Sequence, residues 1–174
     1  MAQIQHSFSR NDEYYTPAYA VRPIMNYLKP ASTIWCPFDT EKSQYVKIFT
    51  ENGFTVIHGH IRTGQDFFNV PVPDCDYIIS NPPYSLKGEV IKRLYEIGKP
   101  FAMLINFQGI FDSKERFKMF RENRVEMLWL SPRVSYIRGG GTGSLKSVRL
   151  SRADICAVGF VRDSWSLHTL KKCE

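Results

Sequence analysis

Short apolar runs alternate with amphipathic segments along most of this 174-residue chain. The apolar runs have the length of buried strands, and the amphipathic segments are long enough to form helices. Strands that alternate with helices form mostly parallel sheets, because each helix returns the chain to the same end of the sheet. The predicted strands span residues 33–38, 54–58, 76–80, 101–106, 125–130, 134–137 and 154–161, and the predicted helices span 17–28, 41–52, 86–97 and 112–123.

We therefore expect an α/β fold with a mostly parallel central sheet and helices on both faces. No helix is predicted between residues 134–137 and 154–161, so these two strands are expected to form an antiparallel edge pair. Ligands in such sheets bind beyond the carboxyl ends of the strands. Residues 36–39 and 81–84 follow two such ends and are expected to line one crevice.

Proline, glycine and polar residues mark the expected helix ends. Thr16 can cap the first helix, and Pro17 suits its first turn. Gly53 and Gly98 are expected to end the second and third helices, because glycine adopts the left-handed backbone of a helix C-terminus without strain.

The run Asn81-Pro82-Pro83-Tyr84 follows the predicted strand 76–80. Two consecutive prolines fix φ and remove two backbone donors, which leaves a stiff stretch of carbonyl acceptors. The side-chain oxygen of Asn81 and the carbonyl of Pro82 can accept both hydrogens of an adenine NH2 group and so aim its nitrogen lone pair. Tyr84 offers a ring for stacking, worth about 1–3 kcal/mol per base in other systems. The run therefore predicts methyl transfer to an exocyclic amine, governed by positioning and electrostatics; the alternative is that the prolines merely end a strand.

The net charge of +6 favours a polyanionic partner such as DNA, with RNA left open. No acidic residue lies between Met127 and Ala153, a stretch that surrounds the glycine-rich run 139–143. A mobile basic loop here is expected to bind phosphates, and a solvated loop without that role is the alternative. Its basic residues are Arg133, Arg138, Lys146, Arg149 and Arg152.

At this length we expect a single domain over residues 1–174, with residues 1–11 flexible. No apolar run approaches a membrane span in length. A metal pair at His58 and His60 lacks a third ligand, so no metal is predicted. The cysteines are far apart, lack metal-site spacing and are interpreted as reduced thiols, which favours the cytoplasm; they are Cys36, Cys75, Cys156 and Cys173.

The order of these motifs resembles the class I S-adenosylmethionine-dependent amino-group methyltransferases. The likeness is strongest to small DNA N6-adenine methyltransferases encoded by phages and mobile elements. Asn81-Pro82-Pro83-Tyr84 matches their catalytic motif, residues 12–17 resemble their N-terminal cofactor motif, and residues 64–68 resemble the segment that holds the cofactor's adenine. The resemblance covers about Asp12 to Val161. It implies a Rossmann-like methyltransferase fold, S-adenosyl-L-methionine as cofactor, catalysis by Asn81, Pro82, Pro83 and Tyr84, and a location in the cytoplasm of a bacterial host.

The resemblance also implies which residues hold S-adenosylmethionine. Tyr15 belongs to the N-terminal motif, in which Thr16 and Pro17 would contact the methionine part. Asp66 would accept a hydrogen bond from the adenine N6, and Phe67 would pack on the adenine ring. From the residues alone, Asp66 is as well explained as a turn cap and Phe67 as a core residue. The other expected cofactor residues lie at the ends of the first two strands and are Cys36, Pro37, Phe38, Asp39 and His58.

Those two strand ends depart from the family pattern. The family has an acidic residue and a glycine-rich turn after the first strand, whereas this chain has Cys36 and no Gly-x-Gly, with Asp39 as the candidate for the missing carboxylate. The family's second strand ends in an acid for the ribose hydroxyls, where this chain has His58. A neutral histidine accepts one hydrogen bond rather than the bidentate pair of a carboxylate.

Three functions stay open on the sequence. The first is N6-adenine methylation of DNA, with the base turned out of the helical stack. The second transfers the methyl group to an RNA base or a protein amide. The third is a non-catalytic protein of this fold that binds nucleic acid or a host protein. Larger family members carry a target-recognition domain for which this chain has no room. The recognition site and the oligomeric state are not predicted; a homodimer and a host-protein partner both remain open.

Overall fold

The computed structural model describes residues 14–106, 112–123, 125–131, 134–138, 147–148 and 154–159. Its main sheet has six strands in the order β3-β2-β4-β5-β9-β6. The first four of these run parallel, and β9 runs antiparallel to both β5 and β6. The predicted α/β fold with a mostly parallel sheet is confirmed. The strands are β2 (Thr33–Cys36), β3 (Thr55–His58), β4 (Tyr77–Ser80), β5 (Phe101–Asn106), β6 (Val125–Trp129) and β9 (Asp154–Gly159).

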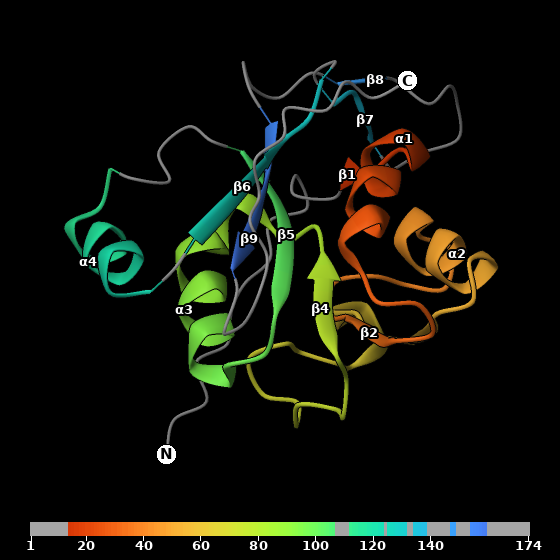
Figure 1. Ribbon diagram of the computed structural model, residues 1–174, viewed down its shortest axis with the longest axis horizontal. Coiled ribbons are helices and arrows are strands. Elements are labelled where there is room, and N and C mark those ends of the chain that lie inside the picture. The colour runs from red at the N-terminus through yellow and green to blue at the C-terminus, as the bar shows by residue number, and fades with distance from the viewer. Residues whose placement is uncertain are drawn as a thin grey trace.

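Helices cover both faces of this sheet, as predicted. Figure 1 shows α1 and α2 on one side and α3 on the other. The α-helices are α1 (Ala18–Val21), α2 (Gln44–Glu51), α3 (Lys87–Ile97) and α4 (Lys114–Glu122), and the 3-10 turns are η1 (Arg22–Tyr27), η2 (Ile61–Thr63) and η3 (Tyr84–Leu86).

Two hydrophobic cores follow from the alternation of side chains along the strands, since successive residues point to opposite faces. On one face Ile34, Ile79 and Leu104 pack with buried residues of α1 and α2. On the other face Trp35, Ile78 and Met103 pack with the apolar side of α3. Because the inner strands are buried on both faces, they are continuous apolar runs.

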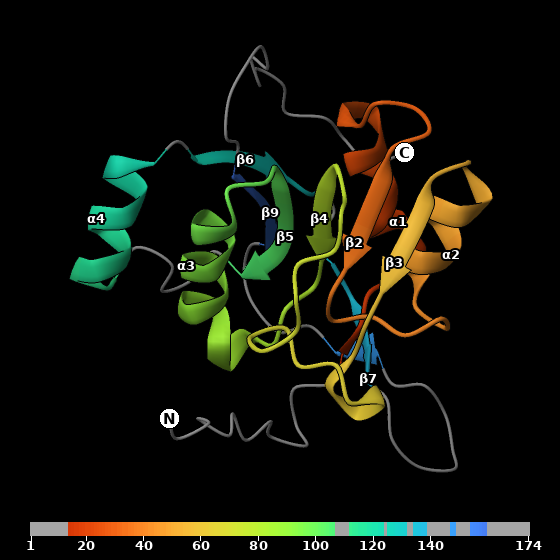
Figure 2. The same cartoon turned by 90° about the horizontal axis from the view of Figure 1, so that it is seen from below.

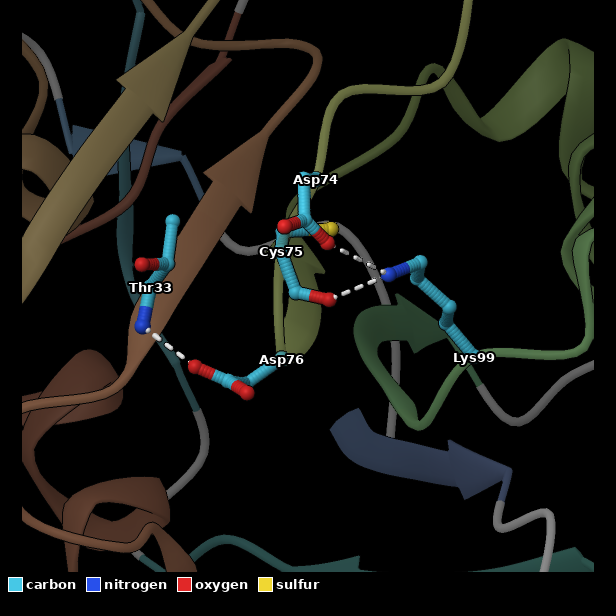
Figure 3. A network of polar contacts seen from close by, with 5 residues as sticks. All are labelled: Thr33, Asp74, Cys75, Asp76 and Lys99. Carbon is cyan, nitrogen blue, oxygen red and sulfur yellow. Dashed lines mark hydrogen bonds and ion pairs between the residues drawn. The ribbon is translucent and has the colours of Figure 1, made fainter.

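Polar contacts fix the amino ends of three neighbouring strands (Figure 3). The Thr33 amide donates to Asp76 Oδ2 at 2.7 Å, and the Asp76 amide donates to the Thr33 carbonyl at 2.8 Å. Lys99 Nζ donates to the Cys75 carbonyl at 2.6 Å and pairs with Asp74 at 3.5 Å. These contacts set the register of β2, β4 and β5, so their carboxyl ends meet at the opposite edge of the sheet.

The predicted helix 17–28 is only partly α-helical. It begins as α1 and continues as the 3-10 turn η1. Pro23 explains the change, because it has no amide to donate to the carbonyl four residues earlier. The expected cap at Thr16 is wrong: Pro17 is the N-cap, without a side-chain hydrogen bond. Gly53 and Gly98 end their helices as predicted, with φ of 82° and 71°.

The expected antiparallel pair of residues 134–137 and 154–161 is also wrong. Strand β9 lies between β5 and β6, where it has a hydrogen-bonded neighbour on each side, whereas an edge position would leave one side of its backbone unpaired. Strand β7 (Tyr136–Arg138) instead joins β1 (Tyr14–Tyr15) and β8 (Ser147–Val148) in a separate three-stranded sheet. Figure 2 shows β7 beyond the arrowhead of β4, as does Figure 1.

Within the described ranges, Cys36 and Cys75 are buried thiols that form no disulfide. The helices of those same ranges include none that is long and apolar enough to cross a membrane.

Candidate active site

The carboxyl ends of β3, β2 and β4 lie side by side at one edge of the sheet. Cys36, the last residue of β2, is level with His58 of β3. The chain leaves β2 into α2 on one face and leaves β4 through η3 into α3 on the other. The connections therefore reverse direction between β2 and β4, which is the position where sheets of this kind bind ligands.

Asn81 follows β4 directly at this edge. Its Oδ1 atom is buried and has no hydrogen-bond partner among the residues that the structure describes. A buried acceptor without a donor costs about 1–3 kcal/mol, so such an atom calls for an explanation. Pro82 and Pro83 are buried as well and hold the backbone beside it. An acceptor fixed in this way can receive a donor that a ligand supplies.

Tyr84 connects the same run to the small sheet. Its ring meets the ring of Tyr136 edge to face, with the centroids 6.2 Å apart. Tyr136 is fully buried and begins β7, and its neighbour Ile137 is level with Tyr15 of β1. The catalytic motif and the N-terminal cofactor motif of the predicted site therefore meet through β7.

The N-terminal segment leaves β1 at Tyr15, which is 45% exposed, and continues through the buried Thr16 to Pro17. The Ser135 amide donates to the Tyr19 hydroxyl at 2.7 Å, which ties α1 to the chain just before β7. Thr16 and Pro17 are thus held beside the small sheet that lies beyond the carboxyl ends of the parallel strands.

Asp39 is buried just beyond β2. The Ser80 hydroxyl donates to its Oδ2 atom, and the Ser43 hydroxyl also bonds its carboxylate. Burial raises the pKa of Asp39 from 3.8 to about 6, although both hydroxyls act to lower it. A direct hydrogen bond therefore joins residues 36–39 to Ser80, the residue that immediately precedes the 81–84 run.

Asp66 and Phe67 already have partners within the protein. Asp66 accepts hydrogen bonds from the Phe68 amide at 3.0 Å and from Asn69 Nδ2 at 2.6 Å. The Phe67 side chain is 2% exposed. Its ring centroid lies 4.9 Å from that of Phe38 and 5.3 Å from the guanidinium carbon of Arg93. Asp66 thus caps a turn and Phe67 belongs to the core, which are the alternative roles that the sequence allows for them. Their roles toward the cofactor's adenine stay predictions, and the half-buried Phe38 is the more accessible of the two rings.

Cys36, Pro37 and His58 complete the strand ends. Burial raises the pKa of the Cys36 thiol well above its usual range, and the charge of Asp39 adds to the effect, so Cys36 stays protonated. Pro37 is buried, and His58 is half-buried beside them. No group of three or more metal-ligating side chains occurs in the described part of the chain.

Asn106 is a candidate site residue that the sequence analysis did not identify. It ends β5, and its Oδ1 atom is buried without a partner among the described residues. By strand alternation it shares the face of Leu104, as Asn81 shares the face of Ile79 on the neighbouring strand. The available signal was a polar residue at the carboxyl end of an otherwise apolar strand.

The basic residues predicted to bind nucleic acid are largely outside the described residues. Arg133, Lys146, Arg149 and Arg152 fall there. Arg138 is placed by its backbone alone, at the end of β7 and level with Tyr14 of β1.

No protein-family model matches the chain, and no curated protein matches it with significance. Among solved structures, a SAM-dependent O-methyltransferase from Thermotoga maritima aligns at a TM-score of 0.50 and 12% identity, over 85% of this chain and 66% of that one. A Pyrococcus horikoshii protein assigned as an RNA methyltransferase aligns at 0.46 and 14% identity, over 91% of each chain. The precorrin 8W decarboxylase of Methanobacterium thermoautotrophicum aligns at 0.42 and 11% identity, over 82% of this chain and 90% of that one.

The first of these likenesses shows the fold: the chain has a Rossmann-like methyltransferase fold, as the sequence predicts. The two alignments with TM-scores below 0.5 add no argument to it. The chain spans just under two thirds of the Thermotoga maritima protein, 66% of its length. At 12% identity the shared fold does not carry over a substrate or a cofactor.

Proposed function

We propose that this chain is an S-adenosylmethionine-dependent methyltransferase that acts on an exocyclic amine, with adenine N6 in DNA as the acceptor. The observation that supports this most directly is the buried Oδ1 atom of Asn81, which lacks a donor among the described residues. An amine hydrogen is the donor it would take. Its position at the end of β4, next to the reversal between β2 and β4, is where ligands of such sheets bind.

The residues of the motif have separate roles in this proposal. Asn81 Oδ1 and the Pro82 carbonyl accept the two amine hydrogens and orient the nitrogen lone pair toward the methyl group. Pro83 keeps the segment stiff, and Tyr84 stacks on the base. Because the two acceptors are fixed before the substrate binds, little reorganisation is needed as positive charge develops on the nitrogen.

S-adenosylmethionine, when bound, supplies an electrophilic methyl group carried on a positively charged sulfur. The chain fits this cofactor at the edge where β3, β2 and β4 end, since Asn81 presents its acceptor at the same edge. Phe38 and His58 are half-buried there and would contact the adenosine part. Thr16 and Pro17 would contact the methionine part, and Tyr15, Pro37, Asp66 and Phe67 would border the site.

DNA as the partner is supported by charge. The chain carries a net +6, and its five candidate phosphate-binding residues come from the acid-free stretch that contains β7. Binding of phosphates by such residues is largely electrostatic and independent of base sequence. RNA bases are the competing acceptor of the same chemistry.

The test is methyl transfer from radiolabelled S-adenosylmethionine to DNA, to RNA and to protein in parallel reactions, with the labelled base identified after digestion. Wild type should label adenine in DNA, and Asn81→Ala should lower the rate about a hundredfold or more, because one of two fixed acceptors is lost. Asn26→Ala is the matched control, since Asn26 is exposed and its side-chain amide donates a hydrogen bond to the Pro23 carbonyl three residues earlier. Transfer by Asn81→Ala at the wild-type rate would contradict the proposal.

A second candidate is a non-catalytic protein of the same fold that binds nucleic acid or a host protein. The contacts of Asp66 and Phe67 favour it, because both expected partners of the cofactor's adenine are engaged within the protein. Calorimetry with S-adenosylhomocysteine separates the two candidates. Binding at micromolar concentration supports the methyltransferase, whereas no binding at millimolar concentration supports the non-catalytic protein.

A further inference from the structure

Asp39 and Ser80 join the two strand ends that border the candidate active site. Ser80 is the last residue of β4 and is 0% exposed, and Asp39 is 8% exposed. The Ser80 hydroxyl donates to Asp39 Oδ2. Asn81 follows Ser80 in the sequence. The backbone position of Asn81, the predicted catalytic residue, therefore depends on the hydrogen bond between Ser80 and Asp39.

The backbone of Asp39 is fixed from the other side. Its amide donates to the Gly59 carbonyl at 2.9 Å, and the Gly59 amide donates to the Cys36 carbonyl at 3.1 Å. Asp39 is therefore held at the end of β3 as well as at the end of β2. Because its backbone is held at the ends of β2 and β3, the Asp39 side chain can fix the end of β4 relative to those two strands.

The carboxylate of Asp39 is turned toward hydroxyl groups of the protein. Besides Ser80, it bonds Ser43, the N-cap of α2, whose oxygen accepts the Val46 amide at 3.2 Å. Water has little access to these bonds because Asp39 is buried. A hydrogen bond from a hydroxyl to a charged carboxylate is roughly twice as strong as a neutral one. The burial that makes the bond strong also raises the pKa of Asp39 to about 6, so the carboxylate is charged at neutral pH.

We infer that Asp39 is a positioning residue that holds Asn81 in place through Ser80, rather than a ligand of the cofactor. The inference rests on the proposed function for the catalytic role of Asn81, whereas the hydrogen bond between Ser80 and Asp39 is observed independently of that role. It changes the role that the sequence suggests for Asp39, which was that of a carboxylate facing the cofactor. Asp39 acts on Asn81 indirectly: it accepts the hydrogen bond from Ser80, and Ser80 is linked to Asn81 by the peptide bond.

Two roles of Asp39 predict different effects of the same substitutions. If Asp39 positions Asn81, then Asp39→Ala and Ser80→Ala should each lower kcat by about ten- to hundredfold, and the double variant should be no slower than either single variant. The dissociation constant for S-adenosylhomocysteine should stay within about twofold of wild type in all three. A tenfold weaker affinity in Asp39→Ala with unchanged affinity in Ser80→Ala would show a direct cofactor ligand and overturn the inference.

Conservative variants and a matched control separate positioning from general damage. Asp39→Asn keeps an acceptor oxygen for Ser80 and should recover most of the turnover that Asp39→Ala loses, as should Ser80→Thr relative to Ser80→Ala. Ser32→Ala is the control, because Ser32 is also a buried serine but precedes β2 at the opposite edge of the sheet. Loss of turnover in Ser32→Ala equal to that in Ser80→Ala would contradict the inference.

Hydrogen–deuterium exchange gives a readout that does not need turnover. The peptide covering residues 78–86 should exchange faster in Asp39→Ala and Ser80→Ala than in wild type and Ser32→Ala. If wild type transfers no methyl group, the proposed function fails while this exchange result still tests the contact. Unchanged exchange in Asp39→Ala would overturn the inference whether or not the protein is an enzyme.

Discussion

The ring of Tyr84 meets the ring of Tyr136 edge to face, with 6.2 Å between the centroids. Tyr136 is fully buried at the start of β7, so the small sheet supports the aromatic residue of the Asn81-Pro82-Pro83-Tyr84 run. Edge-to-face pairs contribute about 0.5–1.5 kcal/mol beyond their buried area. The ring proposed to stack on a base is therefore held by residues far away in the sequence.

We expect substitutions of Tyr84 to separate its ring from its hydroxyl. Tyr84→Ala should lower kcat/KM for DNA about ten- to hundredfold, because stacking on a base contributes about 1–3 kcal/mol. Tyr84→Phe keeps the ring and should stay within a fewfold of wild type. Steady-state kinetics with a fixed DNA substrate measure both values. Equal losses in the two variants would assign the effect to the hydroxyl and contradict a stacking role.

The raised pKa of Asp39 predicts how stability changes with pH. Below pH 3.8, its ordinary pKa, the Asp39 carboxyl is protonated in both the folded and the unfolded state. Between pH 3.8 and about 6 the folded state keeps a proton that the unfolded state loses, so the free energy of unfolding falls as the pH rises. Above about pH 6 the carboxyl is charged in both states, and this contribution stays level. The loss is of the order of 3 kcal/mol for a shift of this size. Asp39→Asn should therefore be more stable than wild type at about pH 8, and the difference should shrink toward pH 4. Urea unfolding at several pH values measures it, and a constant difference would exclude Asp39 as the cause.

The sequence predicts the parallel part of the sheet well, because each strand is an apolar run bounded by turn residues. It does not predict where β9 inserts, since the apolar pattern of residues 154–161 suits an edge strand and an inner strand equally. It also misses the break at Pro23, although that proline was visible within the predicted helix. Local pattern thus determined the elements, and tertiary pairing determined their neighbours.

The candidate site was predictable in part for the same reason. Asn81 was identifiable because its neighbours in the sequence carry the signal. The bond between Ser80 and Asp39 was not, because it depends on the register of β2 against β4. That register is set at the opposite edge by contacts such as the one between Thr33 and Asp76.

Asn106 gives a prediction that joins stability to function. Asn106→Leu removes a buried acceptor that has no partner among the described residues, so stability should stay the same or rise by about 1 kcal/mol. Asn52→Leu is the contrast, since Asn52 Nδ2 donates to the Ile48 carbonyl at 2.8 Å and its loss should cost about 1 kcal/mol. If the Asn106 amide binds substrate or cofactor, Asn106→Leu should also lose activity. A stable variant with full activity would exclude it from the site.

The basic stretch gives a prediction about salt. If residues such as Arg149 and Arg152 bind phosphates, each substitution by alanine should reduce the slope of log Kd against log salt by about 0.9 for duplex DNA, because one fewer counterion is released. The loss of affinity should be similar for different base sequences, since phosphate contacts carry no sequence information.

The control for the salt prediction is Lys29→Ala. The Lys29 amide donates to the hydroxyl of Tyr77, the first residue of β4, so Lys29 lies at the edge of the sheet opposite the candidate site. Fluorescence anisotropy over a range of salt concentrations measures the slopes. Equal slopes for Arg149→Ala, Arg152→Ala, Lys29→Ala and wild type would mean that this stretch is a solvated loop and that the positive charge serves another purpose.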